Sequence, residues 1–168
     1  FRSIYRKIRS LAMDSLDYCA EKDIGQLVPW GDRRWVRDRD ADKKSPMGLM
    51  EALAFAGLME KNIKMSRAAA RIALSIAHYG TWCESIMGLM PGYPWHHRSF
   101  TEERHCICMA LALDWAGYVL TEDGKEVIRD AIIMKGLPRI ESDFKRIEEI
   151  RHMNQGIIFS AGRIIGMM

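Results

Sequence analysis

The sequence lacks the features that would point to metal binding or membrane insertion. None of its four cysteines forms a CxxC pair, and Cys106 and Cys108 are spaced so that they would point to different faces of a helix. The most apolar stretch, Cys106 to Leu120, contains Asp114 and is shorter than the roughly 20 residues that cross a bilayer. We therefore expect buried free thiols, no metal site, no cofactor and no contact with a membrane.

The chain also lacks a strong charge bias. Its net charge is +3, from 25 lysines and arginines against 22 acidic residues. Such a balance permits an acidic polymer as a ligand without requiring one. The arginines between positions 33 and 39 alternate with aspartates, so their fields largely cancel, and we expect no nucleic-acid partner.

Helical periodicity, in contrast, is present along most of the sequence, and no segment shows convincing strand alternation. A length of 168 residues with 48% hydrophobic content fits one globular domain. Because the chain begins at Phe1 and ends in an apolar pattern with no stop signal, we interpret it as a fragment of a longer polypeptide. The sequence therefore predicts a single all-α domain over residues 1–168.

Capping residues locate the expected helices. Ser45-Pro46 and Thr121 are expected to start helices, and Ser99 with Glu102 forms a capping box. Lys135-Gly136-Leu137-Pro138 is expected to end one. The helices so predicted cover residues 4–20, 46–61, 67–84, 100–120, 122–136, 142–150 and 155 onward, with a long loop over 28–45. The helices on either side of Thr121 are joined so tightly that they should form an antiparallel hairpin.

Two side chains within the helices are interpreted as scaffold. Asp114 is expected to be partly buried and paired with Arg71 or Arg104, because it lies among apolar residues. His78, on an alanine-rich helix, is expected in the core or at its boundary.

Several short motifs, taken in order, resemble the helical domain of the heparinase II/III and alginate lyase group of polysaccharide lyases. They are ALALDW from Ala110, LTEDGKEVIR from Leu120 and NQG from Asn154, preceded by a helix that ends in YGTW at Trp82. The likeness covers roughly residues 45–168. It implies helical hairpins that form part of an (α/α) toroid, a long cleft for an acidic polysaccharide, and a β-rich domain downstream in the same polypeptide. It also implies a periplasmic or secreted protein.

Asn154 lies where the resemblance places the asparagine that neutralises the uronate carboxylate. In β-elimination the proton at C5 is removed next to that carboxylate, so an amide donor must offset its charge while a tyrosine or histidine takes the proton. Asn154 also suits a second interpretation, as a plain cap of the last helix. His152 and Gln155 flank it as further donors, although many related lyases have histidine at the position of Gln155. This departure leaves the detailed substrate contact, and activity itself, open.

A second candidate site is the loop Trp95, His96, His97 and Arg98. An aromatic face stacks on sugar rings, imidazoles donate hydrogen bonds, and arginine binds a carboxylate or sulfate bidentately. The alternative is a loop in which Trp95 packs on the helices and the histidines are solvated.

The sequence therefore indicates the helical domain of a lyase that binds a uronate-containing glycan and supports β-elimination. The family's tyrosine base lies downstream of Met168, so residues 1–168 alone are expected to have no turnover. The alternative is a non-catalytic all-α interaction scaffold, and a downstream tyrosine-bearing helix with a β-rich domain would favour the lyase.

Overall fold

The computed structural model describes residues 1–20, 45–80, 82, 99–152 and 154–168. Within these ranges every regular element is helical and no strand occurs, which confirms the all-α prediction for the part described. The loop expected over 28–45 lies outside these ranges except for Ser45. The elements are α1 (Arg2–Asp14), α4 (Pro46–Glu60), α5 (Ile63–His78), α7 (Phe100–Ala116), η2 (Gly117–Val119), α8 (Glu122–Ala131), η3 (Ile132–Gly136), α9 (Leu137–Arg146), η4 (Glu148–His152) and α10 (Asn154–Met167).

The first hairpin is α4 and α5. The Ser45 hydroxyl accepts a hydrogen bond from the Gly48 N–H at 3.1 Å, as the sequence predicted, and α4 ends where Lys61 takes a left-handed conformation with φ of 54°. α5 starts at Ile63 rather than Arg67, because the Asn62 side chain accepts from two backbone N–H groups of its first turn. It ends at His78, before the predicted end at residue 84.

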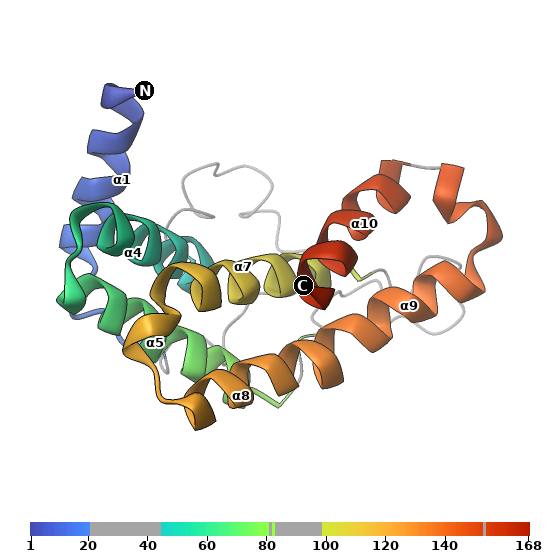
Figure 1. Cartoon of the computed structure of the whole chain (residues 1–168). Helices are drawn as coiled ribbons and strands as arrows, with labels where there is room; N and C mark the ends of the chain where they lie inside the picture. The colour runs from blue at the N-terminus through green and yellow to red at the C-terminus, as the bar shows by residue number, and fades with distance from the viewer. Residues whose placement is uncertain (21–44, 81, 83–98, 153) are drawn as a thin grey trace.

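α7 lies at the centre of the molecule. It packs against α4, α5, α8, α9 and α10, and it lies between the α4–α5 hairpin and α10 in Figure 1. Its buried side chains, with those of α4 and α5, make one continuous apolar core. The largest fully buried members from these three helices are Met50, Leu53, Met65, Ile72, Ile76 and Met109.

α8, η3 and α9 form one uninterrupted helix that runs back along α7, so the predicted hairpin is present (Figure 1). The predicted helix end at Gly136 and the separate helix over 142–150 are wrong. Gly136 has φ of −88°, not a left-handed value, and Pro138 stands in the first turn of α9. Residues 132–136 form a π-helical turn (η3). This wider turn lets the helix continue past Pro138, which has no backbone N–H.

Tertiary contacts explain why this helix continues. A Cβ at Gly136 would collide with the Cys106 sulfur and lie 3.1 Å from the Trp82 ring, so the glycine serves close packing rather than helix termination. Lys135 binds carbonyl groups at the C-terminal end of α5 and not at the end of its own helix. Its Nζ donates to Ala77 O at 2.5 Å and to Tyr79 O at 2.6 Å. Burial lowers the pKa of this lysine.

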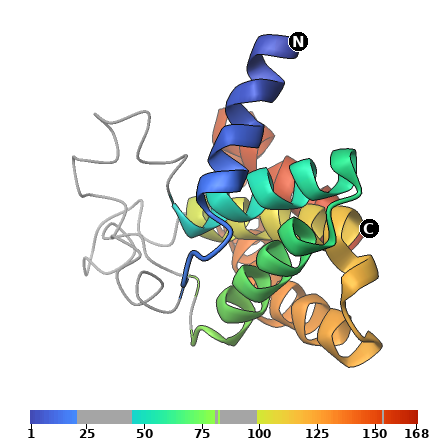
Figure 2. The same ribbon diagram turned by 90° about the vertical axis from the view of Figure 1, so that its left-hand side faces the viewer.

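α1 packs on α4, crosswise, and its N-terminal end projects beyond the other helices in both views (Figures 1 and 2). Tyr5 and Arg9 both donate to Glu60 Oε1, at 3.1 and 2.5 Å. The helix stops at Asp14 rather than residue 20, and residues 15–17 form a turn in which the Ser15 hydroxyl donates to Leu11 O.

The scaffold predictions for Asp114 and His78 are wrong, since both side chains are exposed. Arg104 instead makes a bidentate ion pair with Glu51 of α4, at 2.5 and 2.7 Å. Arg71 donates to the Leu16 carbonyl at 2.9 Å. The spacing of apolar residues in a sequence identifies a helix. It does not show which positions of that helix face solvent once the helices have packed together.

Candidate functional site

The junction between η4 and α10 carries the predicted site residues that the structure describes. His152 is the last residue of η4 and Asn154 the first of α10, and both are exposed. Gln155 lies in the first turn of α10. The remaining candidates, Trp95, His96, His97 and Arg98, lie outside the described residues. The structure therefore places His152 and Asn154 at one helix start, where the helix dipole favours an anion.

This junction depends on Gly156. A Cβ there would overlap the Ile150 carbonyl oxygen and lie only 2.8 Å from the carbonyl carbon. Only a glycine lets the first turn of α10 approach the backbone of η4 so closely. The side chain of Ile150 is fully buried, so η4 is anchored in the core on its other side.

A hollow of about 240 Å³ opens beside the junction. Its lining comes from α9, η4 and α10: Phe144, Arg151, Gly156, Ile157, Ser160 and Arg163. The Ser160 hydroxyl donates to the Gly156 carbonyl at 2.6 Å, while Arg163 binds Glu141 and lies 5.4 Å from the centre of the Phe144 ring. Two guanidinium groups line this hollow, but that of Arg163 is ion-paired with Glu141, so Arg151 supplies its one positive charge that no ion pair among the described residues offsets.

Sequence reasoning missed Arg151, Ser160 and Arg163. Gly156, Ser160 and Arg163 are spaced four and three residues apart, which places them on one face of a helix. That spacing is the only signal in the sequence that could have identified them, and it does not indicate that Arg151 joins them.

A buried aspartate fixes the start of α7 close to this region. Asp143, next to Phe144 in the chain, is 1% exposed, and one of its oxygens accepts from both the N–H and the hydroxyl of Ser99 at 2.8 Å. The predicted capping box of Ser99 and Glu102 is therefore wrong. The Ser99 hydroxyl donates to the Asp143 carboxylate and accepts no hydrogen bond from a backbone N–H of α7. A charge-assisted hydrogen bond to a carboxylate is stronger than one between neutral groups.

The first turns of α7 also hold buried ionisable side chains. Burial raises the pKa of Glu103 to about 7, partly offset by the charge of Arg104. Burial, with the nearby charges of Glu102 and Glu103, raises the pKa of Cys106 to about 12. This thiol therefore stays protonated at neutral pH and is not a nucleophile. The His105 ring stacks on the Trp82 ring, and the ring centres are 5.0 Å apart.

We expect Glu103 to make stability depend on pH. Its folded pKa of about 7 lies above the usual 4.5, so its contribution is complete below pH 4.5 and is lost as the pH rises through 7. The shift corresponds to roughly 3 kcal/mol. Urea unfolding should show that the wild-type chain is less stable at pH 8 than at pH 5. Glu103→Gln should remove this difference in stability. Glu126→Gln, which alters an exposed acid on α8, should keep the wild-type loss, and equal behaviour of the two variants would refute the assignment.

Cys106 and Cys108 are buried thiols that form no disulfide, whereas Cys19 is exposed and Cys83 lies outside the described residues. In the described part of the chain, no group of three or more histidines, cysteines or acids is arranged to hold a metal ion. Nor does that part contain a helix long and apolar enough to cross a membrane.

Comparison of the chain with protein-family models, with curated proteins and with solved structures gives no match.

Proposed function

We propose that this chain is the helical portion of a polysaccharide lyase of the heparinase II/III and alginate lyase type, and that it binds a uronate-containing glycan. Its hairpins would form part of an (α/α) toroid. The observation that carries the proposal is the hollow beside the start of α10, where the exposed guanidinium of Arg151 lies in the lining and Asn154 is the first residue of the helix. An acidic sugar needs cationic groups to hold its charge and a neutral amide to share its carboxylate, and both types of group meet at this junction.

Each group has a distinct part in the proposed chemistry. The Asn154 amide donates to the uronate carboxylate and stabilises the enediolate that forms when the C5 proton leaves. Arg151, which is exposed and free to turn, binds a carboxylate or sulfate of a neighbouring sugar. Arg163 is held by Glu141 and Phe144, so its charge is already paired and its remaining N–H groups act as hydrogen-bond donors at the wall of the hollow. The base that takes the C5 proton comes from outside these residues.

Binding of acidic trisaccharides tests the proposal. Calorimetric titration with trimannuronate and with a heparin-derived trisaccharide should detect binding of at least one that weakens as salt is added. Arg151→Gln should lower that affinity about 10-fold, the scale of one charge-assisted hydrogen bond. Arg67→Gln, an exposed arginine on α5, is the matched control and should bind as the wild type does. Absence of binding, or equal loss in both variants, would overturn the proposal.

A further inference from the structure

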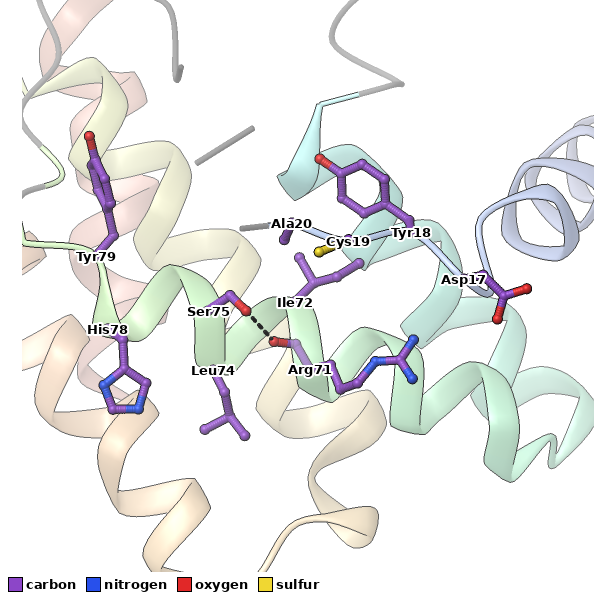
Figure 3. Close-up of a pocket in the computed structure, with 10 residues that line it drawn as sticks. All are labelled: Asp17, Tyr18, Cys19, Ala20, Arg71, Ile72, Leu74, Ser75, His78 and Tyr79. Atoms are coloured by element: carbon purple, nitrogen blue, oxygen red, sulfur yellow. Dashed lines mark hydrogen bonds between the residues drawn. The ribbon is translucent and has the colours of Figure 1, made fainter. Parts of the chain in front are cut away.

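A second and larger hollow lies between the turn that follows α1 and the C-terminal half of α5 (Figure 3). Its volume is about 860 Å³, within the range of roughly 300–1,000 Å³ that small-molecule sites occupy. Its lining comes from residues 17–20 and 71–79, whereas the hollow beside Asn154 is built from α9, η4 and α10. The two hollows therefore share no lining residue among those that the structure describes.

Hydrogen bonds hold the two walls together. Arg71 of α5 donates from one guanidinium nitrogen to the Leu16 carbonyl at 2.9 Å, which ties the turn to the helix. The Ser75 hydroxyl donates to the Arg71 carbonyl at 3.0 Å, so its oxygen remains available as an acceptor. The turn itself is closed by the Tyr18 N–H, which donates to Ser15 O. The hollow is thus a preformed feature of the fold.

The side chains around this hollow combine aromatic rings with matched polar groups. Figure 3 shows Tyr79 at one end and Tyr18 toward the other, with the apolar side chain of Ile72 between them. Both tyrosines are half-buried, so part of each ring remains accessible. In the same view Asp17 and Arg71 lie at the Tyr18 end, and they supply one carboxylate and one guanidinium group.

The charges of this lining select the class of ligand. Among the described lining residues Asp17 and Arg71 carry opposite charges that offset each other, and His78 adds an imidazole that can donate or accept a hydrogen bond, so these side chains do not select for an anion. A carboxylate that accepts, a guanidinium that donates and a hydroxyl that does either match a ligand dense in hydroxyl groups. Tyrosine rings offer an apolar face with a polar tip, which suits the faces of a sugar ring.

We propose that this hollow is a binding site for a neutral sugar ring, separate from the uronate site. Asp17 accepts hydrogen bonds from two hydroxyls of the sugar, Arg71 donates to a third with the nitrogens that Leu16 does not use, and Tyr79 packs against the ring. A glycan that carries both neutral and acidic sugars would then contact the chain at two places.

Saturation-transfer NMR with cellotriose, mannotriose and xylotriose tests this site directly. At least one of these neutral probes should bind the wild-type chain, and Asp17→Ala should weaken that binding about 10-fold, as expected for a lost charge-assisted hydrogen bond. Asp14→Ala is the matched control, because Asp14 is an exposed acid three positions away that does not line the hollow. Tyr79→Ala should weaken binding to a similar extent, with folding checked by circular dichroism.

Two outcomes would overturn the site: no saturation transfer from any of the three probes, or affinities for Asp17→Ala and Tyr79→Ala equal to that of Asp14→Ala. Excess trimannuronate should not displace the bound neutral probe, and displacement would mean that both ligands use one site. If a neutral probe binds the chain but neither trimannuronate nor the heparin-derived trisaccharide does, the uronate proposal is refuted and this one stands.

Discussion

In the lyase proposed above, replacing Asn154 with alanine should lower β-elimination of the uronate polymer about 100-fold or more. This is the scale of effect seen when one hydrogen-bond donor to a developing oxyanion is removed. The loss should fall on turnover rather than on binding, because the amide interacts most strongly with the negative charge that grows as the C5 proton leaves. The measurement is the absorbance of the unsaturated uronate product under saturating substrate.

The same substitution should change folding little. Asn154 is exposed and is the first residue of α10, so its removal should cost at most about 1 kcal/mol of stability. Asn62→Ala is the matched control, because Asn62 accepts from the N–H groups of Lys64 and Met65 and is a true cap. Asn62→Ala should lose stability and keep its turnover. An Asn154→Ala protein that behaves in the same way would remove Asn154 from the site.

Sequence reasoning succeeded where the determining contacts are local. Ser45 and Thr121 cap their helices as predicted, since each accepts from an N–H three residues ahead. The position of the last helix and the hairpin around Thr121 also follow from short-range signals. These features depend on interactions within one turn of chain, which a single sequence displays.

It failed where a distant contact overrides a local preference. The sequence around Gly136 has the pattern of a helix end, but Gly136 instead gives room to Cys106 and Trp82, and the helix continues. Ser99 has the pattern of a cap, but Asp143, 44 positions later, takes both of its donors. The arginines beside Asn154 were missed for the same reason, because they converge only when α9, η4 and α10 pack together.

Gly156→Ala should destabilise the folded chain, against the usual sign for this exchange in a helix. Alanine normally stabilises a helix by roughly 0.5–1 kcal/mol relative to glycine. Here the new methyl group would overlap the Ile150 carbonyl oxygen and come within 3.1 Å of the Arg151 Cα, and both are backbone atoms that cannot rotate away. Overpacking of this kind costs about 1–3 kcal/mol, which exceeds the gain in propensity. Urea unfolding should therefore show a lower midpoint.

Gly124→Ala is the control that separates this clash from glycine removal in general. Its methyl group would meet only side-chain atoms, at 3.3 Å from Leu120 Cδ2 and 3.4 Å from Thr121 Oγ1, and these can shift. That variant should be as stable as the wild type or more so. Because relief of the clash at Gly156 must move η4 away from α10, Gly156→Ala should also separate Arg151 from Arg163 and weaken binding of acidic trisaccharides. A Gly156→Ala protein as stable as Gly124→Ala would show that α10 does not approach η4 this closely.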